Sequence, residues 1–137
     1  MKSTICKIAI SVILSCFILF PLSAKQLFVS PEGDDSADGS SSGNAFKTLS
    51  KAVDAAEEGD EIVLLGIIDI SQEPADKIYN SDAYNKNNQG VKILDKGLTI
   101  SGDPNQTRTK TGFTGNKTTT CLRLDGLNKK VTIRNLT

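Results

Sequence analysis

Hydrophobic residues in the C-terminal half of the chain recur in short runs that alternate with polar residues, a pattern typical of half-buried β-strands. The runs come in pairs joined by a tight turn, and three pairs follow one another after residue 60. Two long polar inserts, at residues 71–90 and 103–120, separate the pairs. The paired runs cover residues 61–65 with 67–70, 91–94 with 98–102, and 122–124 with 131–135.

The spacing of these runs predicts a solenoid. Residues 96–102 align with residues 129–135 at an offset of 33 residues. Leu122 follows Val91 by 31 residues, and Val91 follows Ile62 by 29. Recurrence in this range is the signature of repeat architectures, in which short strands stack on their copies in the next coil. A β-sandwich is the competing fold, since it also uses short strands joined by turns.

We therefore expect an all-β solenoid, a right-handed parallel β-helix. Strand alternation then assigns the side chains that point inward. The predicted inward residues are Ile62, Leu64, Ile68, Ile70, Val91, Ile93, Leu98, Ile100, Leu122, Leu124, Val131 and Ile133.

The region just before the repeats predicts one strand, one loop and one short helix. Residues 27–29 form an apolar run, and residues 30–43 are rich in Pro, Gly, Asp and Ser, as loops are. Residues 45–57 carry apolar side chains at helical spacing, with Asn44 as the candidate N-cap and Gly59 as the candidate end. Because an open coil exposes apolar side chains and unpaired backbone, we interpret this helix as the N-terminal cap of the solenoid.

The first 24 residues have the order of segments found in a secretory signal peptide. Lys2 and Lys7 provide a positive start, and residues 8–22 form a largely apolar run without charge. Small residues then precede the next charge, which predicts cleavage just before Lys25 or Gln26. The predicted organisation is a signal peptide at 1–24, the strand, loop and capping helix at 25–60, and about three coils at 61–137.

Two other fates of the leader stay open. An uncleaved membrane anchor is one, because a spanning helix needs about 20 apolar residues. The other is a lipoprotein, since residues 13–16 resemble a loose lipobox ending in Cys16. The apolar run continues through residues 17–20, whereas a lipidated cysteine is normally followed by a polar tether, so we rank this alternative lower.

Charge and reactive residues narrow the function classes. Removing the leader leaves 14 basic and 16 acidic residues, without the basic excess that nucleic-acid binding requires. The chain contains no histidine, the commonest general base and metal ligand. Cys121 is the one cysteine after the leader, so it has no partner for an internal disulfide, and we expect either a small buried filler or an exposed thiol.

Residues 28–65 read F-V-S-P-E-G-D-D-S-A-D-G-S-S-S-G-N-A-F-K-T-L-S-K-A-V-D-A-A-E-E-G-D-E-I-V-L-L. This stretch resembles the N-terminal segment of bacterial right-handed β-helix proteins, which include some pectate lyases and many surface proteins of the polymorphic outer-membrane kind. Residues 62–66 and 131–137 look most like the surface-protein branch, which implies adhesion or display rather than catalysis. Of that branch's repeats, F-x-x-N occurs once, at residues 113–116, and G-G-A-I is absent.

Two constellations are candidates for chemistry. Asp34, Ser36 and Asp38 imitate the start of a calcium loop, but the twelfth position, where a bidentate Glu would close it, is Ala45. We interpret this segment as a turn held by its own side chains, with calcium as the weaker alternative. Polysaccharide lyases of the resembled fold use a Lys or Arg base beside carboxylates. The candidates for such a set are Lys92, Arg123 and Arg134 with Asp69, Asp95 and Asp125, and we interpret them as a solvated mixed-charge surface.

These features predict an exported cell-surface or secreted β-helix segment with a structural or adhesive role and no catalytic activity of its own. The alternative is the N-terminal part of a β-helix polysaccharide lyase or a related carbohydrate-active enzyme. We expect no cofactor and no nucleic acid. The expected partner is a host or matrix protein or a glycan, bound through the inserts at 71–90 and 103–120, at the outer-membrane surface of a bacterium or outside it.

The last predicted coil lacks an obvious cover. Residues 131–137 are as strand-like as the earlier coils, and no closing helix follows them. We expect a fragment truncated at its C-terminus, with Leu124, Val131 and Ile133 uncovered. Such an open coil also predicts self-association through its unpaired strand edge.

Overall fold

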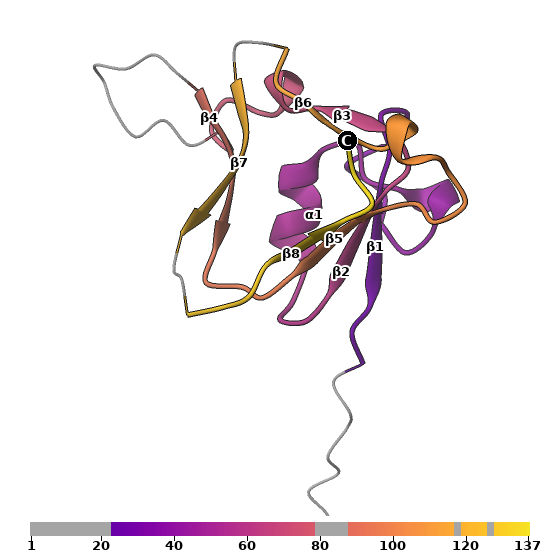
Figure 1. Cartoon of the computed structure of the whole chain (residues 1–137), viewed down its shortest axis with the longest axis horizontal. Coiled ribbons are helices and arrows are strands. Elements are labelled where there is room, and N and C mark those ends of the chain that lie inside the picture. Colours follow the sequence, from indigo (N-terminus) through magenta and orange to yellow (C-terminus); the bar gives the residue numbers. More distant parts are fainter. Residues whose placement is uncertain (1–22, 79–87, 117–118, 126–127) are drawn as a thin grey trace, which may run out of the picture.

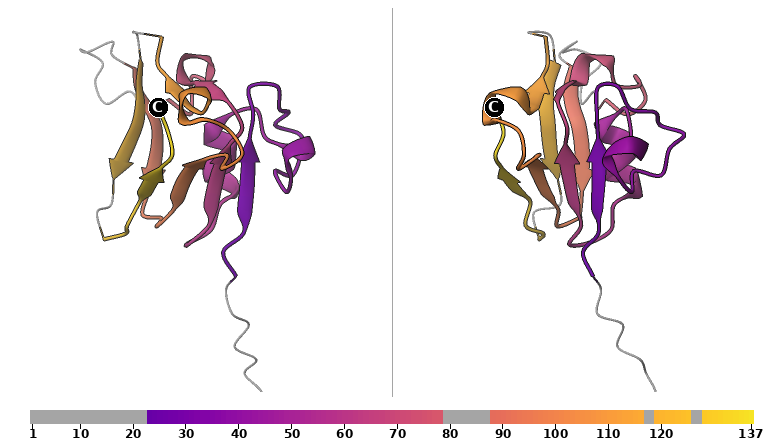
Figure 2. Two further views of the ribbon diagram at one scale, coloured as in Figure 1. Left: turned by 45° about the vertical axis from the view of Figure 1, so that its right-hand side comes forward. Right: turned by 90° about the vertical axis from the view of Figure 1, so that its right-hand side faces the viewer.

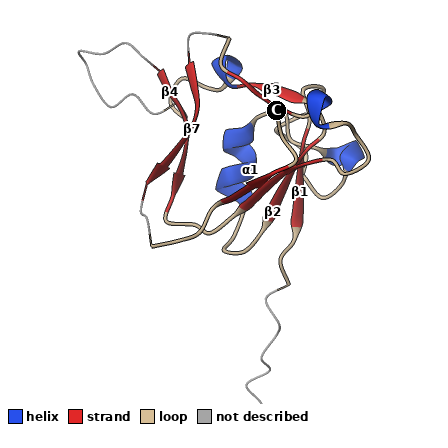
Figure 3. Ribbon diagram, in the orientation of Figure 1, coloured by secondary structure: helices blue, strands red, loops and turns tan. Residues whose placement is uncertain are grey.

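The computed structural model describes residues 23–78, 88–116, 119–125 and 128–137 (Figure 1). Strands predominate in this part of the chain, and its one α-helix lies among them (Figure 3). The predicted leader lies almost entirely outside the described residues, as do Cys6 and Cys16. The elements are β1 (Gln26–Val29), η2 (Ser42–Asn44), α1 (Leu49–Ala55), β2 (Glu61–Leu64), β3 (Ile67–Asp69), η3 (Ile70–Gln72), β4 (Asn88–Leu94), β5 (Thr99–Gly102), η4 (Arg108–Lys110), β6 (Gly112–Thr114), β7 (Thr119–Asp125) and β8 (Thr132–Arg134).

Within the described residues the strands form three sheets, and every pairing between two of these strands is parallel. An isolated antiparallel bridge joins Ile78 to Val91 of β4. One sheet has the order β1-β2-β5-β8, and the other two consist of β3 with β6 and of β4 with β7. The chain therefore passes through β2, β3 and β4 before β5 returns to lie beside β2 (Figure 1). Stacked parallel strands are what the predicted solenoid requires, and the assignment of the chain to a right-handed β-helix stays a prediction.

Two of the three predicted offsets agree with the observed register. Thr99 pairs with Thr132 at the predicted offset of 33, and Val91 pairs with Leu122 at the predicted offset of 31. The third is wrong, because Ile62 pairs with Ile100 rather than with Val91. The predicted unit has two strands and overlooks β6, a three-residue strand inside the polar insert, whereas a turn of the chain contains three strands. The prediction therefore aligned β2 with β4 of the same turn instead of with β5 of the next one.

The inward side chains build one hydrophobic core. Most predicted inward residues are buried, but Leu124 and Ile133 are 42% and 50% exposed, and Leu122 and Val131 are half-buried. These residues lie on or beside β7 and β8, each of which is paired with a strand on one side only within the described residues, β7 with β4 and β8 with β5. Leu124 and Ile133 are thus exposed, as expected, whereas Val131 packs partly against the core. That these residues belong to an open last coil stays a prediction. The buried core consists of Leu27, Val29, Phe46, Leu49, Ala52, Val53, Ala56, Ile62, Leu64, Ile68, Ile70, Val91, Ile93, Leu98 and Ile100.

Helix α1 is shorter than predicted and starts at a different cap. It spans Leu49–Ala55 rather than residues 45–57, and Thr48 accepts the capping hydrogen bond from Lys51 N in place of the predicted Asn44. Asn44 ends the separate turn η2. The helix lies at the β1 end of the largest sheet, while β8 lies at the opposite end (Figure 2). This is the position that a cap on the first coil would occupy.

A buried carboxylate, Glu73, ties the N-terminus of α1 to the start of the first polar insert. Its Oε1 accepts from Leu49 N at 2.6 Å, and its Oε2 accepts from Ser50 N at 3.1 Å and from Ser50 Oγ at 2.5 Å. Helix N-termini leave N–H groups without partners, so a carboxylate there satisfies them and complements the helix dipole. Burial nevertheless outweighs these hydrogen bonds and raises the pKa of Glu73, with Asp35 adding to the rise.

Replacing Glu73 with glutamine should therefore change how stability depends on pH. Because the folded-state pKa of Glu73 is raised, its proton binds more tightly in the folded protein, and stability falls as pH rises from the unfolded value through the folded one. Urea unfolding between pH 3.5 and 7 should show that, as pH increases, the free energy of unfolding of the variant rises relative to that of the wild type. If the wild type instead becomes more stable relative to the variant as pH increases, the three hydrogen bonds outweigh burial in setting the pKa of Glu73.

Candidate binding groove

The largest sheet presents one face to the core and the other to solvent. Alternation places Leu27 and Val29 of β1 toward α1, and the residues between and before them outward. The register then aligns the outward residues of four strands in two rows across the sheet. One row is Gln26, Glu61, Thr99 and Thr132, and the other is Phe28, Val63, Ser101 and Arg134.

A network centred on Glu61 joins these rows. Its Oε1 accepts from Ser101 Oγ at 2.6 Å and from Arg134 Nη2 at 2.5 Å, and its Oε2 accepts from Gln26 Nε2 at 3.0 Å. Burial of Glu61 raises its pKa, but the hydrogen bonds from Arg134, Ser101 and Gln26 outweigh that effect, so the pKa is lowered overall. The carboxylate thus stays ionised and fixes three polar side chains from three other strands.

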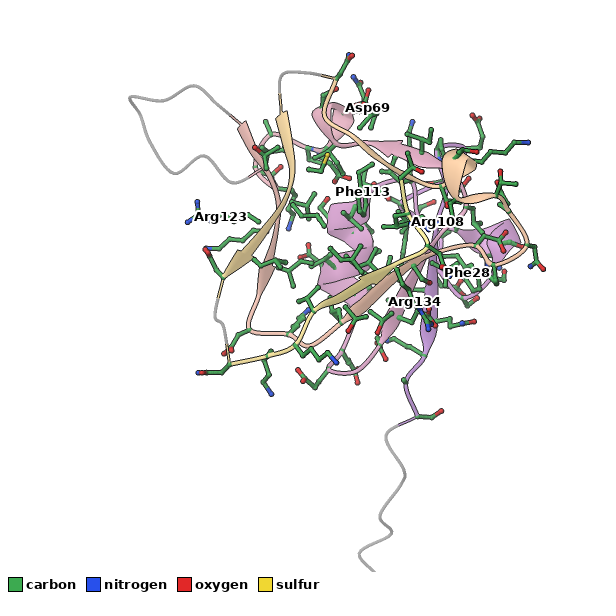
Figure 4. The ribbon with its side chains drawn as sticks, viewed as in Figure 1. Phe28, Asp69, Arg108, Phe113, Arg123 and Arg134 are labelled. Carbon is green, nitrogen blue, oxygen red and sulfur yellow. The ribbon has the colours of Figure 1, made fainter. Side chains whose placement is uncertain are left out.

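A groove of about 450 Å³ runs over this network. Phe28, Val63 and Leu65 provide its apolar surface. Ser42 of η2 lies at one side, and residues 103–105 of the second polar insert lie at the other. Figure 4 labels Phe28 and Arg134, which come from the first and the last strand of this sheet. The volume lies in the range of small-ligand sites, about 300–1,000 Å³, and the mixture of apolar surface with a few oriented polar groups is typical of them.

The candidate calcium loop is a pair of turns. Asp34 Oδ1 accepts from Ser36 N at 2.8 Å, and Asp38 Oδ1 accepts from Ser40 N at 2.9 Å and Ser40 Oγ at 2.7 Å. Hydrogen bonds from these serines lower the pKa of both aspartates. Within the described residues, no cluster of three or more acidic, Cys or His side chains could hold a metal ion. The side chains of Asp34, Ser36 and Asp38 therefore have a structural role as turn residues, and calcium binding stays a prediction.

The candidate lyase residues are dispersed over different sheets. Asp125 Oδ2 lies 3.1 Å from Lys92 Nζ and 3.2 Å from Arg123 Nε, on the sheet formed by β4 and β7. Hydrogen bonds from Lys92 and then Arg123 lower the pKa of Asp125. Asp95 follows the same sheet, and its N–H donates to the Asp125 carbonyl at 3.2 Å.

The remaining members of that set lie elsewhere. Arg134 belongs to the Glu61 network on the largest sheet. Asp69 ends β3, and its Oδ1 accepts from Ser71 N and Ser71 Oγ, which caps η3. The three aspartates therefore do not line one common groove. In Figure 4, Arg123 projects from one side of the molecule, and Arg134 lies on another sheet.

Cys121 is half-buried and packs against the core, between the two environments that the sequence left open. Burial, with a smaller contribution from the charge of Asp69, raises the pKa of its thiol. A raised pKa disfavours the thiolate, so this side chain has the properties of a filler rather than of a nucleophile.

No protein-family model, curated protein or solved structure was found to match this chain. Among the described residues, no helix is both long enough and apolar enough to cross a membrane. A function for this chain must therefore be inferred from its own residues, above all from those of the groove.

The groove itself was missed in the sequence. Arg134 was noted only as an outward cation, and Gln26, Phe28, Glu61 and Ser101 were not singled out as site residues. The signal was nevertheless present, because the outward positions of four aligned strands could be listed once the strand offsets were known. What hid it was the wrong partner assigned to β2.

Proposed function

We propose that this chain is an exported, non-catalytic segment of a bacterial surface β-helix that binds a glycan in the groove over Glu61. Three features support the first part: the signal-peptide pattern predicted at 1–24, the parallel stacking of short strands and the resemblance at residues 28–65. The observation that carries the second is the combination of Phe28 with polar side chains held in place by Glu61.

The chemistry of the groove suits a sugar. A sugar ring offers an apolar C–H face and a rim of hydroxyl groups that both donate and accept hydrogen bonds. Phe28 and Leu65, which are partly exposed, offer apolar surface for the C–H face, and the exposed Gln26 and Asn105 offer donors and acceptors for the hydroxyl groups. Glu61 already holds the side chains of Gln26, Ser101 and Arg134 in place. Ligand binding would therefore cost little further side-chain conformational entropy.

The charge of the groove favours a neutral glycan over a polyuronate. Glu61 and Asp103 contribute two carboxylates, and Arg134 contributes one cation that is already paired with Glu61. A polyanion would meet net negative charge there. The lyase alternative has less support, because its candidate bases and carboxylates are divided among separate sheets instead of lining one groove. Lys92 and Arg123 lie with Asp125 on the sheet of β4 and β7, Arg134 lies on the largest sheet, and Asp69 ends β3.

Two further expectations belong to this proposal. The insert at 103–120 contributes residues 103–105 to the groove, so a partner held by this insert would contact the groove as well. Much of the insert at 71–90 lies outside the described residues. The open edge of β8 and the exposed Leu124 and Ile133 support self-association of this chain at high concentration.

A glycan array followed by calorimetry tests the binding role. The purified exported chain should bind neutral oligosaccharides better than polygalacturonate. Replacing Phe28 with alanine should weaken binding by about tenfold, the order expected from an aromatic contact of about 1.4 kcal/mol. Replacing Arg123 with alanine is the matched control, because it removes a charged side chain from a different sheet and should leave binding unchanged.

Two results would contradict the proposal. One is no binding to any neutral glycan by a chain whose circular dichroism is that of a folded protein. The other is release of unsaturated product from polygalacturonate, which would favour the lyase alternative.

A further inference from the structure

Asp60 is a nearly buried carboxylate that faces the backbone nitrogen of Lys25. Its residue exposure is 3%, and its Oδ1 lies 3.0 Å from Lys25 N. Its Oδ2 accepts from Glu57 N at 2.8 Å and lies 3.7 Å from Lys25 Nζ. The backbone of Asp60 is equally fixed, since its carbonyl accepts from Thr99 N at 2.9 Å. Asp60 therefore joins the turn after α1 to the first residue before β1.

The partner of Asp60 changes its charge if the leader is removed at this point. In the uncleaved chain, Lys25 N is a neutral amide, and the nearest full positive charge is the ε-ammonium of Lys25 at 3.7 Å. A buried carboxylate is costly unless it is paired with a charge and hydrogen-bonded. After cleavage before Lys25, the same nitrogen, already at hydrogen-bond distance from Oδ1, carries the charge.

We propose that removal of the leader between Ala24 and Lys25 creates an α-ammonium group that forms an ion pair with Asp60 and so fixes β1 to the rest of the fold. In this hydrolysis the C–N bond breaks, the hydroxyl of water joins the Ala24 carbonyl, and a proton of water joins the Lys25 nitrogen. The resulting primary amine takes up one further proton from solvent at neutral pH. The inference rests on the proposed export and deepens it by selecting one cleavage position.

The geometry of the junction is compatible with this step. Ser23, Ala24 and Lys25 are all exposed, so the bond to be cut is accessible. β1 begins one residue later, at Gln26, and Glu61 N donates to the Lys25 carbonyl at 2.9 Å. Cleavage before Gln26 would remove Lys25, and with it the acceptor of Glu61 N and both contacts of Asp60 with the Lys25 backbone nitrogen and ε-ammonium.

The other charged groups around the Lys25 nitrogen do not replace this pair. The ε-ammonium of Lys25 also donates to a helix carbonyl, Ala55 O, at 3.3 Å. Glu61 is engaged by the groove network, and Lys96 donates to carbonyls at the end of α1. Glu57 contributes its N–H to Asp60 and adds negative charge nearby. The α-ammonium is thus the group best placed to balance Asp60.

A pair of chains that differ only at the N-terminus tests the proposal. One begins at Lys25, and the other carries Ala24 as one extra residue. Both contain the whole hydrophobic core, which begins at Leu27. At pH 6.5 the chain that begins at Lys25 should melt about 5 °C higher, the order expected for a charge pair at a nearly buried carboxylate in a domain of this size.

The pH dependence of the difference in melting temperature distinguishes an ion pair of the α-amino group from a contact that does not involve its charge. An α-amino group paired with Asp60 has a raised pKa when folded, so its stabilisation is complete below the unfolded value of about 8 and is lost as pH rises above it. The difference in melting temperature should therefore shrink between pH 7 and 10. It should also disappear when Asp60→Asn is introduced into both chains. Because this variant can fail to fold, a chain beginning at Lys25 with an acetylated α-amino group provides a second test that keeps Asp60 intact, and it should melt like the chain extended by Ala24.

Equal melting temperatures of the two chains would overturn the proposal. A difference between them that persists at pH 10 would also overturn it, as would an acetylated chain that still melts higher than the chain extended by Ala24. N-terminal sequencing of the exported protein separates this failure from failure of export. A start at Lys25 supports the proposal, and a start at Gln26 or at a lipidated Cys16 overturns it while leaving export intact. A start at Met1 contradicts cleavage of the leader itself.

Discussion

Replacing Ile100 with alanine is expected to destabilise the protein by about 3 kcal/mol, whereas the same change at Ile133 should cost less than about 1 kcal/mol. The two residues are neighbours in one column of the largest sheet, where Ile62 pairs with Ile100 and Ile100 pairs with Ile133. Ile100 is fully buried, and Ile133 is 50% exposed. Identical side chains at equivalent positions thus differ only in what covers them.

Urea unfolding followed by circular dichroism measures both changes, with Ile62→Ala as a second buried member of the column. Its exposure is 0%, so its loss should resemble that of Ile100. Measurements at low micromolar concentration limit association through the open edge of β8. A loss at Ile133 as large as that at Ile100 would show that β8 is covered in solution, and would support self-association instead of an exposed last strand.

Replacing Gly39 with alanine is expected to cost about 2–4 kcal/mol, because a strained backbone and a steric collision add together. Gly39 has a φ of 70°, in the left-handed region that side chains disfavour. A Cβ at this position would also collide with the ring of Phe46, which is a core residue only 2% exposed. The ring cannot move away without opening the core beside α1.

Two other glycines separate these contributions. Gly43 lies in the same loop, has open space within 4 Å of the position that a Cβ would occupy, and is not in the left-handed region, so Gly43→Ala should be nearly neutral. Gly59 has a φ of 89° but open space around it, so Gly59→Ala should cost about 1–2 kcal/mol from backbone strain alone. Thermal and urea unfolding rank the three variants. Equal effects at Gly39 and Gly59 would exclude a contribution from the Phe46 ring.

The sequence by itself determined where most strands lie and which faces they bury. Strands β1, β2, β5 and β8 fall on the predicted runs to within two residues at each end. β5 and β8 are marked by alternation of apolar and polar residues, and β1 and β2 by short apolar runs bounded by polar residues. The offsets of 31 and 33 also gave the correct register for β4 with β7 and for β5 with β8. Register follows from the pattern there because a shift by one residue would turn the apolar side chains outward.

The sequence could not show the complete turn of the chain. β6 has three residues, Gly112–Thr114, and only Phe113 among them is strongly apolar, so no periodicity marks it. It is a strand because β3 lies beside it, which depends on the path of the chain through both polar inserts. Without β6, the alignment of β2 with β4 was the natural but wrong choice.

Contacts between distant residues were decided by the tertiary structure alone. Thr48 caps α1, rather than Asn44, because Asp35 accepts from Thr48 N and Thr48 Oγ1 and fixes the chain just before the helix. Glu73 reaches the same helix from 23 residues further along the sequence. The Glu61 network likewise joins four strands that only stacking brings together. Short-range periodicity encodes which side of a strand is buried, but a polar side chain gains its partner only when separate turns of the chain are placed next to each other.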